Sequence, residues 1–176
     1  MTILNFTIFN LILYSIVGWI IEGIYSYITT GRFKKNGFLK GPYKPMYGIA
    51  FTLLILINEY FNLNIIFTII LYIAIPTVVE FISGYLLLEI FNEKYWDYSN
   101  LKYNYKGLIT LKFSIYWALL SYIGITYVSP MITNYYLSLE TMIRPINALL
   151  AIIILADTIL TVTSKLSLKK SRLLNS

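Results

Sequence analysis

The chain has 176 residues, of which 58% are hydrophobic and 12% are charged, about half the charged share of an ordinary soluble domain. It contains no cysteine and no histidine, which excludes disulfides and thiol nucleophiles and removes the usual zinc ligand and neutral-pH base. The net charge of +6 comes from basic residues in short clusters between apolar runs, a pattern typical of membrane topology rather than nucleic-acid binding. We therefore expect an all-α, polytopic integral membrane protein with no metal, no cofactor and no nucleic-acid partner.

Apolar runs long enough to cross the hydrocarbon core of a bilayer divide the chain into about five transmembrane helices of one domain. The predicted helices cover residues 5–28, 45–61, 64–91, 107–129 and 144–165. The first run should remain in the mature protein, because residues 1–5 lack the positive charge that begins a cleavable signal peptide. Two longer connections, 29–44 and 91–107, and a basic tail at 166–176 lie outside the helices.

The orientation follows from the basic residues. Thirteen of the fourteen Lys and Arg residues lie in residues 29–44, in residues 91–112 or in the last twelve residues, and Arg144 is the exception. Short basic connections stay in the cytoplasm. The sequence therefore predicts that both connections and the C-terminus are cytoplasmic and that the N-terminus is outside.

Residues 37–48, GFLKGPYKPMYG, carry more specified backbone geometry than any other connection. Glycine reaches backbone angles that other residues avoid, and proline fixes φ and removes an amide donor, so this segment should turn sharply into the helix that follows. The motif residues are Gly37, Gly41, Pro42, Pro45, Tyr47 and Gly48. Two interpretations stay open: a cytoplasmic gate or headgroup-binding turn, and an ordinary membrane-surface turn with its lysines in water.

Three carboxylates, Glu22, Glu80 and Asp157, fall inside predicted membrane helices, where an unpaired charge costs several kcal/mol. They lie at similar predicted depth beside small or polar neighbours, which lets their helices approach closely. We expect them to surround one substrate- or ion-binding cavity open to the cytoplasm, with Trp96 and Asp97 near its mouth. The alternative is that each carboxyl makes a separate hydrogen bond that only holds the bundle together.

A second motif, Trp96-Asp97-Tyr98-Ser99, is followed by Asn104 and Gly107. Alone it is weak, because interfacial aromatics and an Asp that caps a turn are common in membrane proteins. Its combination with Gly18-Trp19, Glu22 and the 37–48 motif resembles the putative ABC-transporter type IV family of small bacterial membrane proteins. One departure is Asn36, where the family pattern has an Arg before the first motif glycine.

The resemblance implies a permease-like or transport-associated subunit, a putative ABC transporter permease, in the bacterial inner membrane. The chain has no GxxxxGK phosphate loop, so an ATP-driven role requires a separate ATPase on the cytoplasmic face, with 91–107 as the natural docking surface. Five helices are few for a transport path, so we also expect a homo-oligomer.

Two other classes of function remain as alternatives. The first is an integral membrane enzyme acting on lipid headgroups, in which Lys35, Lys40 and Lys44 hold a phosphate and Asp97 or Glu22 is the general base. The absence of His and Cys argues against it. The second is a structural membrane subunit with no binding site.

Overall fold

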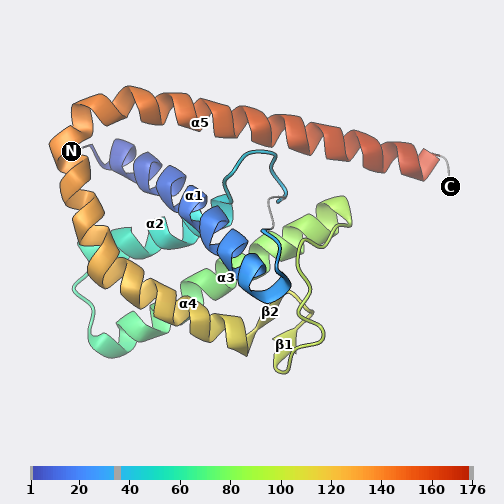
Figure 1. The fold of residues 1–176 in the computed structure, drawn as a ribbon, viewed down its shortest axis with the longest axis horizontal. Coiled ribbons are helices and arrows are strands. Elements are labelled where there is room, and N and C mark those ends of the chain that lie inside the picture. Colours follow the sequence, from blue (N-terminus) through green and yellow to red (C-terminus); the bar gives the residue numbers. More distant parts are fainter. Residues whose placement is uncertain (1, 34–36, 175–176) are drawn as a thin grey trace.

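The computed structural model describes residues 2–33 and 37–174 and is almost entirely helical (Figure 1). In chain order the elements are α1 (Ile3–Thr30), α2 (Pro45–Tyr60), α3 (Ile65–Phe91), β1 (Asn104–Tyr105), β2 (Ile109–Thr110), α4 (Leu111–Ile123), the π-helical turn η1 (Gly124–Val128) and α5 (Ser129–Leu174). The prediction of a helical membrane protein is confirmed at this level.

Local sequence signals account for the ends of the first three helices. Gly31 ends α1 with a left-handed φ of 71°, and its N–H donates to the Tyr27 carbonyl at 2.9 Å. Pro45 is the first residue of α2, where a missing amide costs nothing. The side chain of Asn64 caps α3 by accepting from the Phe67 N–H at 3.0 Å.

The last three elements form one continuous helical path, whereas the sequence predicted two helices separated by a connection at 130–143. That stretch contains no glycine, and Pro130 lies in the first turn of α5, where proline is tolerated. The helix changes direction instead of ending. Figure 1 shows this turn in the orange part of α5. Pro145 lies inside α5, and proline is a common cause of helix kinks.

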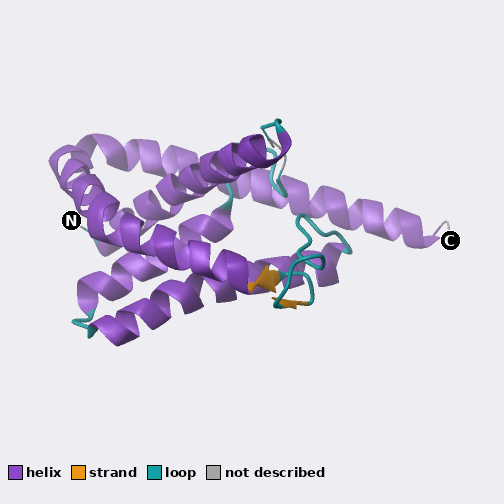
Figure 2. Ribbon diagram, turned by 60° about the horizontal axis from the view of Figure 1, so that its bottom comes forward, coloured by secondary structure: helices purple, strands orange, loops and turns teal. Residues whose placement is uncertain are grey.

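A short antiparallel hairpin replaces the expected start of the fourth helix at Gly107. β1 pairs with β2 in the register Asn104 with Thr110 and Tyr105 with Ile109. The turn between the strands has positive φ at Lys106 (56°) and at Gly107 (69°), which ends the strand and delays the helix to Leu111. Figure 2 shows the two strands as the sole departure from helix and loop in the described chain.

Three helical stretches in the described residues are long and apolar enough to cross a membrane: 3–30, 65–91 and 111–171. α2, with 16 residues, extends only about 24 Å. Large apolar side chains also cover the outside of the bundle, among them Ile65, Ile66 and Phe67 at more than half exposure. Such a surface is suited to lipid rather than to water.

The two ends of the bundle differ in what fills them. Near the N-terminus lies an aromatic and aliphatic core: Phe6, Tyr14, Phe51, Leu54, Ile55, Tyr72, Ile125 and Tyr136. At the opposite end, the loop end, lie residues 31–33 and 37–44 and the 92–110 connection, and the C-terminal half of α5 runs toward this side (Figure 1). The polar side chains predicted to be functional lie at the loop end.

Candidate functional site

Asp157 of α5 holds the motif loop, residues 37–44 before α2, in place. Its Oδ2 accepts hydrogen bonds from the backbone N–H groups of Lys40 (3.0 Å) and Gly41 (2.9 Å) and from the Tyr43 hydroxyl (2.7 Å). Thr161 donates to the other oxygen at 3.1 Å. One carboxylate therefore satisfies a turn that lies more than a hundred residues earlier in the chain.

The Tyr43 hydroxyl is suited to remain a donor in this arrangement. Its burial and the adjacent Asp157 carboxylate both raise the pKa of Tyr43 well above its usual range. The hydroxyl therefore stays protonated, and the bond to Asp157 persists at any physiological pH.

The motif glycines are required for close packing rather than for unusual backbone angles. Among the described glycines, positive φ occurs at Gly31 and Gly107 and not at the motif positions. A Cβ at Gly41 would overlap the ring of Tyr43, and a Cβ at Gly48 would overlap backbone and side-chain atoms of α1. Gly48 thus lets α2 lie directly against α1, and Gly41 lets Tyr43 fold back toward Asp157.

Glu22 joins the end of the motif loop to α1. It forms an ion pair with Lys44, and Tyr47 donates to its Oε2 at 3.2 Å. The Lys44 amide also donates to the Ser15 carbonyl at 2.9 Å. These contacts fix both the side chain and the backbone of Lys44 at the entrance of α2.

Glu80 of α3 is the most enclosed of the three carboxylates, with 2% of its surface exposed. The Tyr98 hydroxyl donates to Oε1 and the Trp117 indole N–H donates to Oε2, each at 2.9 Å. Tyr47 packs edge-on against Trp117 with ring centroids 5.1 Å apart, which links the surroundings of Glu80 to those of Glu22.

Glu22 and Glu80 both line a pocket of about 340 Å³ between α1, α3 and α4. Trp96 lines it too, together with Tyr47 and Tyr98 from the two motifs. The Trp96 ring lies over Gly84, where a Cβ would come within 2.9 Å of it. The pocket is therefore built by both motifs, by α1 and α3, which contribute Glu22 and Glu80, and by α4.

The convergence of all three carboxylates on one cavity is not found in the described part of the chain. Asp157 does not line the Glu22–Glu80 pocket. Its oxygens instead accept hydrogen bonds from the motif loop and from Thr161. A larger, mostly apolar pocket of about 610 Å³ lies between the motif loop, α1, α3 and α5, and Glu22, Trp96 and Thr158 line it. Asp157 thus positions the loop that borders this second pocket.

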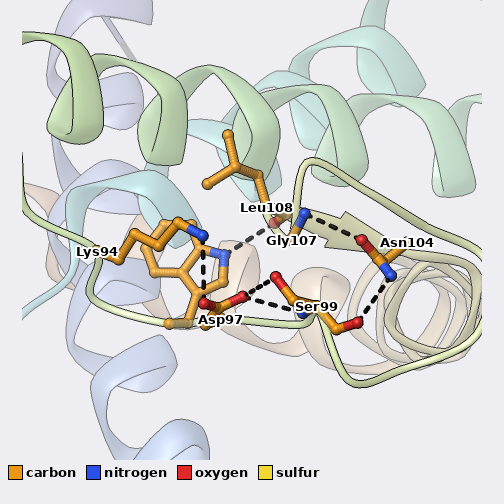
Figure 3. A network of polar contacts seen from close by, with 7 residues as sticks. Lys94, Asp97, Ser99, Asn104, Gly107 and Leu108 are labelled. Atoms are coloured by element: carbon orange, nitrogen blue, oxygen red, sulfur yellow. Dashed lines mark hydrogen bonds and ion pairs between the residues drawn. The ribbon is translucent and has the colours of Figure 1, made fainter.

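The second motif closes a compact turn around Asp97 (Figure 3). Asp97 Oδ1 accepts from the backbone N–H (2.9 Å) and hydroxyl (2.5 Å) of Ser99, and Lys94 lies 3.2 Å from Oδ2. The Asn104 side chain donates to the Leu101 carbonyl at 2.7 Å and accepts from the Gly107 N–H at 3.1 Å. These contacts are short-range, so the segment can form its own structure.

Gly107 and Trp96 complete that turn. Gly107 has a φ of 69°, and a Cβ there would lie 2.5 Å from both Asp97 Oδ1 and the Ser99 hydroxyl. The Trp96 indole N–H donates to the Leu108 carbonyl at 2.8 Å. Hydrogen bonds from Ser99, and then from Lys94, lower the pKa of Asp97 to about 2, so it is a fixed anion rather than a proton carrier.

The three helix carboxylates share one feature: each accepts a hydrogen bond from a tyrosine hydroxyl. The tyrosine lies either in a connection or in the first turn of the helix that follows a connection. The pairs are Asp157 with Tyr43, Glu22 with Tyr47 and Glu80 with Tyr98. Sequence reasoning singled out Tyr47 and Tyr98 but passed over Tyr43 and Trp117. Spacing along the chain carried no signal for either, because their partners lie 114 and 37 residues away.

Two of the residues suggested for a lipid enzyme, Lys44 and Asp97, are bound to other side chains of the protein. Lys44 is ion-paired with Glu22, and Asp97 is half-exposed and held by Ser99. Lys35 lies outside the described residues, as does Asn36. No group of three or more His, Cys, Asp or Glu residues that could hold a metal ion occurs in the described chain.

The fold and the site define a helical membrane protein with two acidic side chains in a pocket at one end of its bundle. A family model for Putative ABC-transporter type IV matches residues 9–162. The chain belongs to this family, which confirms the resemblance seen in its motifs. No solved structure matches the chain.

Proposed function

We propose that the protein is a permease-like, transport-associated subunit of the bacterial inner membrane, and that it works with a separate ATPase. The observation that carries this proposal is the pocket lined by Glu22 and Glu80. A carboxylate enclosed among membrane helices costs several kcal/mol unless it is paired or protonated, and such residues typically mark substrate or ion pathways. Both motifs of a transporter-named family contribute to this pocket.

In the proposed topology the chain crosses the membrane five times, with the N-terminus outside and the loop end in the cytoplasm. The two basic connections lie at one end of the bundle and the C-terminal part of α5 extends toward the same side (Figure 1), as the positive-inside rule requires. Because the chain has no native cysteine, single-cysteine labelling tests this directly. A probe confined to the outside should label Asn62→Cys and not Asn100→Cys, and the reverse result would invert the topology.

The 92–110 connection is the proposed docking surface for the ATPase. Tyr103 is 80% exposed and Tyr105 56% exposed, and Lys102 and Lys106 flank them in the sequence. Aromatic residues are enriched at interface centres, and charged residues at the rim of an interface steer a partner of opposite charge. We also propose that the protein forms a homo-oligomer, since five helices enclose little space.

Copurification from native membranes tests the assembly. A tagged chain should recover an ATPase subunit identifiable by mass, and Tyr103→Ala combined with Tyr105→Ala should reduce that recovery. Tyr60→Ala, at a tyrosine of the other end that is about as exposed as Tyr105, should not reduce it. Recovery of the protein without any ATPase, under conditions that preserve other membrane complexes, would contradict the proposal.

Within this proposal the site residues have two roles. Glu22, Glu80 and Trp96 line the binding pocket. Asp97 positions the 92–110 connection beside it, and Asp157 positions the motif loop that borders the larger pocket. Gly37, which borders the larger pocket, and Pro42 shape the motif loop. Glu80→Gln should abolish the transport that the complex supports, since it removes the enclosed charge while keeping an oxygen acceptor.

A further inference from the structure

The lining of the Glu22–Glu80 pocket indicates the chemical class of its ligand, an inference that rests on the proposed function. Seven of the fifteen lining residues are aromatic, and four of them, Tyr25, Tyr98, Phe113 and Tyr116, form one cluster around the Phe113 ring. The Phe113 ring lies 4.6 to 5.6 Å from the ring centroids of the other three. Among the described residues that line the pocket, none is Lys or Arg.

The charges leave one carboxylate without a basic partner. Glu22 is paired with Lys44, whereas Glu80 accepts only neutral donors, Tyr98 and Trp117, within the described chain. Each Glu80 oxygen therefore keeps capacity for a further donor. A monovalent cation would pair with that charge, and an anion would be repelled by it.

The aromatic surfaces distinguish an organic cation from a metal ion. Alkali and alkaline-earth cations need about six oxygen ligands, whereas nearly half of the residues that line this pocket are aromatic. Ring faces attract organic ammonium groups through their quadrupole, most strongly where water is excluded. A volume of about 340 Å³ accommodates a small molecule of this kind.

We propose that this pocket binds a small organic cation of the amine or quaternary ammonium type, with Glu80 as its counter-ion and the aromatic side chains as its walls. Phe113 and Tyr116 of α4 form one wall, and Tyr98 of the second motif forms part of another. The second motif thus acts on the ligand through Tyr98 and Trp96 rather than through Asp97.

Tryptophan fluorescence of the purified full-length protein in micelles provides the test, because Trp96 and Trp117, two of its three tryptophans, line the pocket. The probe is choline, and its neutral isostere 3,3-dimethylbutanol is the control ligand. We expect a saturable change with choline and an apparent affinity at least about tenfold lower for the isostere.

Two variants and one matched control make the test specific. Glu80→Gln should weaken choline binding at least about tenfold, and Tyr116→Leu, which removes a ring while leaving the Glu80 contacts, should weaken it severalfold. Glu89→Gln makes the same change at an exposed position of the same helix and should bind like the wild type. Thermal midpoints verify that each variant is folded.

Absence of a saturable response in the wild type overturns the inference. So does equal binding of the isostere, or equal binding by Glu80→Gln and Glu89→Gln. None of these results affects recovery of an ATPase with the tagged chain, so failure of this inference and failure of the proposed function are separable.

Discussion

The two connections at the loop end are held in place by opposite means. The motif loop is fastened by Asp157, a side chain 116 residues after Gly41, whereas the 92–110 connection is closed by its own Asp97, two residues before Ser99. The first connection therefore depends on where α5 packs. The turn around Asp97 in the second is closed by its own hydrogen-bonding partners, while Tyr98 of that connection also donates to Glu80 of α3.

The two connections should therefore respond differently to mutation of the carboxylate that holds each of them. Damage to a distant carboxylate should release the motif loop while the 92–110 turn stays intact, and damage to Asp97 should have the reverse effect. The two motifs nevertheless each bring a tyrosine to the same pocket: Tyr47, in the first turn of α2, and Tyr98, in the second connection. Loss of either should alter the pocket, but for different structural reasons.

The largest effect is expected for Asp157→Ala. Three donors of the motif loop lose their acceptor together, at about 1 kcal/mol each, so the free energy of unfolding should fall by about 3 kcal/mol. Limited trypsin digestion of inside-out vesicles should show faster cleavage at Lys40 and an unchanged rate at Lys102. Equal acceleration at both lysines would mean that the whole loop end, and not one connection, depends on Asp157.

Gly41→Ala should have the next largest effect. The added Cβ overlaps the Tyr43 ring, so Tyr43 must move away from Asp157 at a cost of about 1–2 kcal/mol. Lys40→Ala is the matched control, because it keeps the backbone N–H that Asp157 binds. Chemical denaturation of the two variants should place Gly41→Ala clearly below Lys40→Ala, and identical midpoints would remove the close-packing explanation.

A smaller effect concerns the pH response of the 92–110 turn. The pKa of Asp97 is lowered from 3.8 to about 2, so Asp97 stabilises the folded turn above pH 3.8, and this contribution is lost as the pH falls through about 2. Ser99→Ala removes the largest cause and should raise the pKa of Asp97 toward 3.8. Carboxyl carbon NMR suits the measurement, because Asp97 and Asp157 are the two aspartates of the chain. An unshifted titration in Ser99→Ala would contradict the assignment.

The smallest effect is expected for Lys94→Ala. Lys94 is paired with Asp97 at 3.2 Å on a half-exposed surface, where water and salt screen the interaction. The denaturation midpoint should be indistinguishable from that of the wild type. A clear loss would show that the turn relies on this ion pair more than on Ser99.

The contrast between the connections also explains what the sequence could predict. Pro45 at the start of α2 and the Asp97-Tyr98-Ser99 turn were recognisable because their partners are neighbours in the chain. The membrane helices were recognisable because lipid demands long apolar runs. The sequence did not predict that the helix continues through residues 129–144, because a polar stretch of this composition is compatible with a bent helix and with a loop.

The contacts of the carboxylates could not be predicted in the same way. Burial cost identified Glu22, Glu80 and Asp157 as polar sites inside helices, but not which partners satisfy them. Depth alone suggested one shared cavity. The structure separates Asp157 from the other two because α5 packs against the motif loop, and packing between distant helices leaves no local pattern in a single sequence.

A double-mutant cycle between Tyr43→Phe and Asp157→Ala tests most directly whether a carboxylate of α5 fastens the motif loop. In the wild type, Tyr43→Phe should cost about 1 kcal/mol of unfolding free energy, through loss of the hydroxyl that donates to Asp157. In the Asp157→Ala background the same change should cost almost nothing, because the acceptor is already absent. Additive costs, equal within about 0.5 kcal/mol in the two backgrounds, would show that Tyr43 and Asp157 act independently and would contradict the account.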